Sequence, residues 1–262
     1  MVSTPPTKGL ELVFADEFNG PDLDREVWLP HYLPMWSSRA ASAATHAVAD
    51  SCLVLTIPPE QGLWCDPDHR PPLRVSGVQT GSFSGPVGST VGQQPYRTGL
   101  TVQEEQAPFC GWTPDGGLIE ARLRGEVTPR SMVAFWLVGL EQVPEQSAEI
   151  CVAEVFGNAV HPDGSTAVGM GLHAFRDPEV REDFAALRLP LDVADFHTYA
   201  VDWAPDQVDF LVDGELVRTC QGPPGYPLQA MLAVFDFPEW STGDDDHDVP
   251  LLAVDWVRCY RR

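Results

Sequence analysis

Two acidic side chains interrupt one of the most apolar stretches of the sequence. Glu149 and Glu154 lie in S-A-E-I-C-V-A-E-V-F-G, residues 147–157, and a second apolar run precedes it at 132–138. Val, Ile and Phe at this density are typical of β-strands. A solvated sheet edge is the ordinary explanation for two glutamates on a strand. A run this apolar is instead expected near the middle of its sheet, where a charged side chain usually has a partner or a function.

The spacing decides whether the two glutamates can act together. Side chains alternate along a regular strand, so residues 149 and 154 would point to opposite faces. A β-bulge at Val152-Ala153 would add one residue and bring Glu149, Cys151 and Glu154 to one face. Two glutamate side chains that lean together from such positions reach a carboxyl separation of about 5–5.5 Å, the spacing of retaining glycosidases. In that chemistry one carboxylate attacks the anomeric carbon, and the other donates and later accepts a proton.

Length and composition indicate the elements that must hold this pair. The chain has 262 residues, of which 25 are Pro and 22 are Gly, scattered throughout. Short strand-like runs follow one another with turn residues between them, without βαβ alternation or internal repeats. We therefore predict one all-β domain over residues 1–262, an antiparallel β-sandwich of the jelly-roll type.

The expected elements follow from apolar and alternating runs. Gly81 to Trp112 is rich in Gly, Pro, Ser and Gln and is predicted to be a long irregular excursion, which in a compact domain tends to be functional. Pro178 to Leu187 has a weak helical pattern, and Asp213-Gly214 is a strong hairpin signal. The predicted strands are 10–14, 52–57, 75–80, 117–124, 132–138, 149–156, 166–175, 196–203, 207–212, 215–219, 229–237 and 251–260.

Net charge limits the partners. The formal charge of −22 argues against nucleic acid and anionic membrane surfaces, and it weakly disfavours sulfated or uronic-acid polymers. A neutral polysaccharide or oligosaccharide remains open as a substrate, and we expect a monomer. No run approaches the length of a membrane span. Met1 to Pro6 lacks the apolar core of a signal peptide, so the chain as written is expected to be cytoplasmic or a mature secreted form.

The six cysteines offer no metal motif. None is in a C-x-x-C pair, so zinc has no support, and buried free thiols are expected. The sequence also has no G-x-S-x-G, phosphate loop or dinucleotide fingerprint, so no cofactor is required. The acidic run at 244–248 lacks EF-hand spacing and is predicted to be a solvated loop.

Glu149-Ile150-Cys151-Val152-Ala153-Glu154 resembles the E-x-D-x-x-E signature of glycoside hydrolase family 16. Further blocks resemble this family in the same order and span nearly the whole chain: 16–28, 76–80, 117–122, 134–137, 196–203, 210–214 and 254–258. The resemblance implies a concanavalin A-like jelly roll with a substrate cleft on its concave sheet. It also implies Glu149 as nucleophile, Glu154 as acid/base, and retaining endo-hydrolysis of a neutral β-glucan with β-1,3 or mixed β-1,3/1,4 linkages. A transglycosylase is a third possibility.

Cys151 stands where the family pattern has Asp. That aspartate is thought to donate a hydrogen bond to the nucleophile and to help set the protonation of the pair. A thiol is a weak donor and carries no charge near neutral pH unless its pKa is lowered. Cys151 is thus either a small residue tolerated beside a working nucleophile or the mark of an impaired site. The second reading predicts a non-catalytic carbohydrate-binding protein of the same fold.

Other residues match substrate-contacting positions of the family, each with an ordinary alternative. Trp136, Phe235 and Trp240 are candidate sugar-stacking aromatics, and the alignment favours a cleft position for Trp136, although it and Phe235 could instead be core. Glu120 and Arg122 share one strand face and could instead form a surface ion pair. His173 matches a cleft-side histidine and could instead be packed. Asp255 matches an aspartate through which some members bind a structural calcium.

Overall fold

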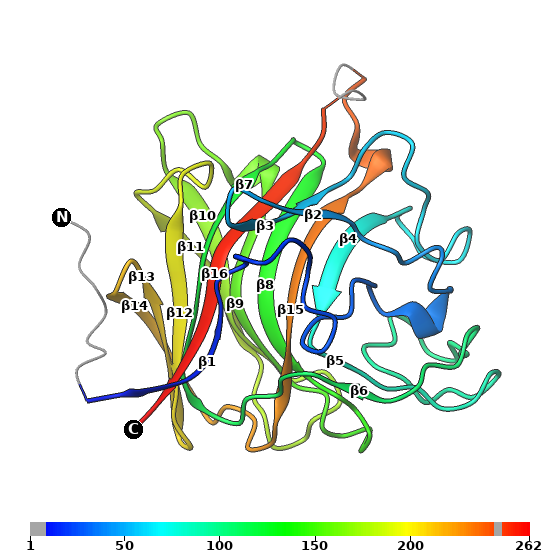
Figure 1. The fold of residues 1–262 in the computed structure, drawn as a ribbon, viewed down its shortest axis with the longest axis horizontal. Coiled ribbons are helices and arrows are strands. Elements are labelled where there is room, and N and C mark those ends of the chain that lie inside the picture. Colours follow the sequence, from blue (N-terminus) through cyan, green and yellow to red (C-terminus); the bar gives the residue numbers. More distant parts are fainter. Residues whose placement is uncertain (1–8, 244–247) are drawn as a thin grey trace.

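The computed structural model describes residues 9–243 and 248–262. Residues 1–8, which include the Met1 to Pro6 segment, and residues 244–247 of the acidic run lie outside the described part. Two antiparallel sheets face each other in the described chain, and the long strands of both layers run between the top and the bottom of the view in Figure 1. The prediction of an all-β antiparallel sandwich is confirmed.

The larger sheet contains eight strands in the described part of the chain, in the order β14-β13-β12-β7-β16-β3-β2, with β1 paired to β16. Its strands are β1 (Glu11–Asp16), β2 (Thr45–Ala49), β3 (Cys52–Thr56), β7 (Gly117–Glu126), β12 (His197–Trp203), β13 (Gln207–Val212), β14 (Glu215–Gln221) and β16 (Leu251–Arg261).

The second sheet carries the glutamate strand. Over the described residues it has six strands in the order β11-β10-β9-β8-β15-β4. They are β4 (Arg74–Gln79), β8 (Ser131–Gly139), β9 (Glu149–Phe156), β10 (Thr166–His173), β11 (Asp183–Leu189) and β15 (Leu228–Asp236). The strand that carries both glutamates, β9, has two strands on one side and three on the other. It therefore lies near the middle of its sheet, as the apolar run predicted.

Small elements complete the described chain. Two short strands, β5 (Gly81–Ser82) and β6 (Phe109–Cys110), pair with each other at the two ends of the long excursion. Three 3₁₀ turns are η1 (Pro34–Trp36), η2 (Gly157–Ala159) and η3 (Pro238–Trp240). No helix in the described residues is long and apolar enough to cross a membrane.

Two apolar clusters stabilise the fold. The main core fills the space between the sheets and includes Phe135 of β8, Ile150 of β9 and Tyr199 of β12. The second cluster lies on the opposite face of the six-stranded sheet, over β8, β15 and β4, where Trp36 and Trp64 from loops pack on strand residues. Because these loops cover one half of that outer face, the face is left for a ligand mainly over β9, β10 and β11.

Most predicted strands are present within a residue or two. The segment 178–187 was predicted to be helical, and this is wrong: residues 183–189 form β11, which pairs along its length with β10. β2 was not predicted. Asp213 and Gly214 both have positive φ, 50° and 80°, as the hairpin prediction requires. All six cysteines, each among the described residues, are free, and four are buried.

Candidate active site

The register of β9 brings the two glutamates to one face. On the β8 side Phe135 is opposite Ala153 and Trp136 is opposite Cys151, so Val152 has no partner of its own. The same shift appears against β10. The predicted bulge is therefore present. Val152 and Ala153 both point into the main core, which leaves Glu149, Cys151 and Glu154 together on the outer face of the six-stranded sheet.

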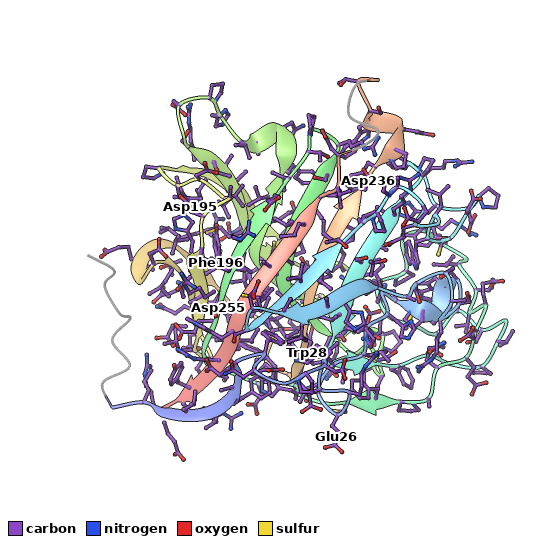
Figure 2. The ribbon with its side chains drawn as sticks, turned by 45° about the horizontal axis from the view of Figure 1, so that its top comes forward. Glu26, Trp28, Asp195, Phe196, Asp236 and Asp255 are labelled. Atoms are coloured by element: carbon purple, nitrogen blue, oxygen red, sulfur yellow. The ribbon has the colours of Figure 1, made fainter. Side chains whose placement is uncertain are left out.

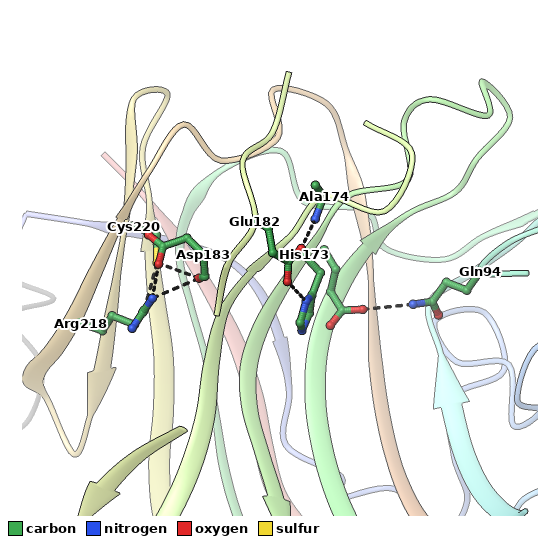
Figure 3. Close-up of polar contacts among 8 residues, drawn as sticks. Gln94, His173, Ala174, Glu182, Asp183, Arg218 and Cys220 are labelled. Atoms are coloured by element: carbon green, nitrogen blue, oxygen red, sulfur yellow. Dashed lines mark hydrogen bonds and ion pairs between the residues drawn. The ribbon is translucent and has the colours of Figure 1, made fainter. Parts of the chain in front are cut away.

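Glu149 is almost enclosed, with 8% of its surface exposed. Its carboxylate accepts a hydrogen bond of 3.1 Å from the side-chain amide of Gln94 (Figure 3). Burial first, and then the charge on Glu154, raise the pKa of Glu149 to about 8, although the hydrogen bond from Gln94 acts in the opposite direction.

Glu154 is less enclosed than Glu149. It lies opposite Gly169 of β10, and the Phe184 ring of β11 is so close to Gly169 that a Cβ there would lie 2.6 Å from it. Burial raises the pKa of Glu154, and the charge of His173 lowers it. Because residue 169 is a glycine, there is space beside the carboxyl group of Glu154, and the Phe184 ring lines one side of that space.

Cys151 is buried between the two glutamates. Its thiol lies 3.8 Å from the carbonyl oxygen of Gly169 and is oriented to donate to it. Burial raises the pKa of this thiol well above its usual value, and the charges of Glu149 and Glu154 add to the effect. The side chain is therefore a neutral thiol whose weak hydrogen bond goes to the backbone.

His173 is directly across from Glu149 on β10. Its Nδ1 lies 2.6 Å from Oε1 of Glu182, whose other oxygen accepts from the backbone of Ala174 at 3.0 Å (Figure 3). The imidazole also stacks on Phe184, with ring centroids 4.5 Å apart. His173 is thus beside the glutamate pair, as predicted, and Glu182 fixes the orientation of its ring.

The three candidate aromatics have different surroundings. Trp136 and Phe235 are on the same sheet face as the glutamates, but each is 5% exposed within the second cluster, and Tyr32 packs edge-on against Phe235. Their faces are covered, so we correct their predicted stacking role to a structural one. Trp240 is 42% exposed and stacks on Phe237 with centroids 4.1 Å apart, so its ring is accessible to a sugar.

Glu120 and Arg122 are not with the glutamates. Their neighbours Ile119, Ala121 and Leu123 on β7 point into the main core. Alternation then places Glu120 and Arg122 on the outer face of the eight-stranded sheet, with the whole core between them and β9. The predicted substrate contacts are therefore corrected: Arg122 pairs with Asp255 and lies over the Phe196 ring, 4.5 Å from its centroid.

Asp255 does not fit a calcium site in this arrangement. The Arg122 guanidinium is bonded to its carboxylate, and a bound cation would have to displace that charge. Within residues 9–243 and 248–262, no three His, Cys, Asp or Glu side chains are grouped as metal ligands would be.

Two residues at the site were missed in the sequence. Gln94 is in the 81–112 excursion, whose length indicated a functional segment without indicating which side chain reaches the glutamates. Phe184 is in the segment wrongly predicted to be helical. The alternation in D-F-A-A-L-R-L was the signal that could have placed Phe184 on the same face as His173.

The family match agrees with this geometry. The sequence pattern described as Glycosyl hydrolases family 16 matches residues 116–258, more than half of the chain and including the whole of β9. The chain belongs to glycoside hydrolase family 16. No curated protein sequence matches it.

Solved structures of this family are similar to the chain. A GlcNAcα1-4Gal-releasing endo-β-galactosidase from Clostridium perfringens has a TM-score of 0.81 and 25% identity, covering 99% of this chain and 64% of its own. This family 16 chain thus spans less than two thirds of that protein. The catalytic domain of an endo-1,3-β-glucanase (laminarinase) from Thermotoga petrophila has a TM-score of 0.66 and 18% identity, and the match covers 96% of this chain and 98% of that one. A third structure is described with endo-acting O-glycanases of human gut microbiota that initiate mucin breakdown. It has a TM-score of 0.60 and 17% identity, and the match covers 95% of this chain and 98% of that one.

Proposed function

We propose that this family 16 protein is a retaining, endo-acting glycoside hydrolase with Glu149 as nucleophile and Glu154 as acid/base. The observation that carries the proposal is the β9 bulge, which brings the buried Glu149 and the partly buried Glu154 to one sheet face. A charged pair in such a position is costly for folding, since each carboxylate has lost hydration and repels the other. Two-step glycoside hydrolysis uses this arrangement.

The reaction needs one proton on the pair. An oxygen of ionised Glu149 attacks the anomeric carbon while the glycosidic bond breaks and the Glu154 proton moves to the leaving oxygen. Glu154 then takes a proton from water, and the water oxygen attacks the same carbon and releases Glu149. Two inversions give net retention. Because burial raises both pKa values and the charges repel, the pair holds one proton near neutral pH.

A β-galactoside within a neutral glycan is our proposed substrate. The fold agreement with the Clostridium perfringens endo-β-galactosidase, at a TM-score of 0.81, supports this choice over the β-glucan expected from the sequence. The laminarinases at 18% identity support only the fold. The exposed Trp240 and the exposed Phe175, two residues beyond His173, offer aromatic faces for further sugar units.

The decisive experiment is a product assay on a glycan panel. Poly-N-acetyllactosamine, mucin-type O-glycans, agarose-type galactan, laminarin and barley glucan would be incubated with the protein, and new reducing ends measured. We expect new reducing ends from a β-galactoside, and NMR should show that the β-anomer is formed first. Glu149→Gln should lower the rate by at least about 1,000-fold. Glu26→Gln, on an exposed side chain at the lower edge of the molecule in Figure 2, should not change it.

Azide separates the two roles. With an activated substrate, Glu154→Ala should be rescued by azide to give the β-glycosyl azide, whereas Glu149→Ala should give the α-azide. Binding of a glycan without any cleavage would contradict the hydrolase and support the carbohydrate-binding alternative. Release from glucans alone would overturn the choice of galactoside.

A further inference from the structure

The motif cysteine leaves the nucleophile position without a strong donor from its own strand. The thiol of Cys151 donates toward Gly169 rather than toward Glu149. It is also kept neutral by its burial and by the two flanking carboxylates. A charge-assisted hydrogen bond to Glu149 must therefore come from another element.

Gln94 supplies that bond from a distant part of the chain. Its Nε2 lies 3.1 Å from Oε2 of Glu149, across 55 residues of sequence. In Figure 3 it approaches from the side opposite to His173 and Glu182. An amide is a donor that does not ionise, so it can hold the carboxylate at any pH at which the protein is folded.

An ion pair between a buried glutamate and a partly exposed arginine fixes the backbone of Gln94. Its N–H donates to Oε1 of Glu141 at 2.6 Å, and the other oxygen of Glu141 pairs with the Arg176 guanidinium. Glu141 is buried, and Arg176 also donates to the carbonyl of Pro144 at 3.2 Å. Three separate loops are thus joined directly beside Glu149.

Gln94 and Glu141, which are joined by this hydrogen bond, both have a strained backbone. Gln94 has φ 42° and Glu141 has φ 57°, in the left-handed region that side chains other than Gly rarely adopt. Such conformations persist where surrounding contacts determine them, and they cluster at functional sites. Here the Glu141–Arg176 pair provides those contacts.

We propose that Gln94 is a positioning residue for the reaction, whose amide replaces the absent motif aspartate as the hydrogen-bond donor to Glu149, with Glu141 and Arg176 fixing its loop. The proposal rests on the assigned role of Glu149. By stabilising the ionised form of Glu149, the amide favours the state in which the shared proton is on Glu154. The site is then adapted to Cys151 and not disabled by it.

The test compares Gln94→Met with Gln103→Met. Methionine has a similar size and lacks the donor, and Gln103 is an exposed glutamine of the same excursion whose amide bonds only locally to Thr101. We expect Gln94→Met to lower kcat by about 10- to 100-fold with little change in KM, because a bond to a charged group is lost. The acidic limb of the pH profile, which reports the ionisation of Glu149, should move upward by about one unit. Adding Cys151→Asp should restore part of kcat.

A second measurement does not depend on turnover. Carboxyl-labelled glutamate would be titrated by ¹³C NMR, with the Glu149 signal assigned by its loss in Glu149→Gln. The midpoint of this signal should rise in Gln94→Met and stay constant in Gln103→Met. An unchanged midpoint, or a loss of kcat with unmoved pH limbs, would overturn the role of Gln94. A shifted midpoint in a protein that cleaves no glycan would instead contradict the proposed function alone.

Discussion

The carboxyl group of Glu149 lies where water barely reaches it, and this has a consequence for stability. A group whose pKa is higher in the folded than in the unfolded chain contributes stability below its unfolded pKa and loses it as the pH rises through the folded value. For Glu149 that window runs from about 4.3, the usual value for Glu, to about 8. The folded protein thus holds a proton in this range that the unfolded chain releases.

Glu149→Gln should therefore stabilise the protein, and more so at alkaline pH. Glutamine mimics the neutral acid and does not titrate, so we expect melting temperatures similar to the wild type at pH 5. At pH 9 the variant should melt higher by at least about 5 °C. Calorimetry at pH 5, 7 and 9 measures this difference, with Glu26→Gln as a control that stays flat. A gain that does not grow with pH would contradict the raised pKa of Glu149 in the folded protein.

The sequence patterns predicted which side chains share a strand face better than they predicted where that face lies in the molecule. Alternation and the proposed bulge placed Glu149, Cys151 and Glu154 on one face, and the register confirms it. The same alternation correctly put Glu120 and Arg122 on a shared face of their strand. It could not reveal that this face belongs to the other sheet, because periodicity describes one strand and not how the two sheets are stacked.

At the scale of elements, β10 makes room for the site by lacking side chains. Gly169 and Gly171 lie opposite Glu154 and Cys151. Gly171 has φ +146°, and a Cβ there would lie 2.1 Å from the carbonyl oxygen of Asp183 on β11. The close approach of β10 and β11, which holds Phe184 beside the glutamates, depends on this glycine.

Gly171→Ala should separate the two strands. We expect a loss of about 2–4 kcal/mol in the free energy of unfolding, from the backbone clash and the unfavourable φ together. Gly225→Ala is the matched control, because a Cβ there meets no atom within 4 Å. Urea denaturation of both variants measures the effect. Equal stabilities would show that β10 and β11 are not held as closely as described.

The errors at this scale have physical reasons. Residues 178–187 contain Glu, Arg, Ala and Leu, which favour helices, but pairing with β10 overrides that weak preference. The excursion at 81–112 was correctly predicted to be largely irregular. Its contact with Glu149 joins residues 55 positions apart, and no local pattern carries such information.

For the whole molecule, net charge governs which glycans can approach. The protein carries a formal charge of −22. Two arginines around the glutamate site are neutralised, since Arg176 pairs with Glu141 and Arg218 pairs with Asp183. A polyanionic chain would therefore be repelled at long range, and a neutral chain would be indifferent to the field of the protein.

The preference for neutral glycans should appear as a difference in salt dependence between a charged and an uncharged form of the same polymer. We would measure kcat/KM on a sulfated β-galactan and on its desulfated form between 10 and 200 mM NaCl, a range over which the screening length falls from about 30 Å to below 10 Å. The neutral form should stay constant within about twofold, because it has no charge to repel. The sulfated form should be the poorer substrate at low salt and improve several-fold as repulsion is screened. Faster cleavage of the sulfated form at low salt would instead require a cationic subsite beside Glu149, and would contradict a site built for neutral glycans.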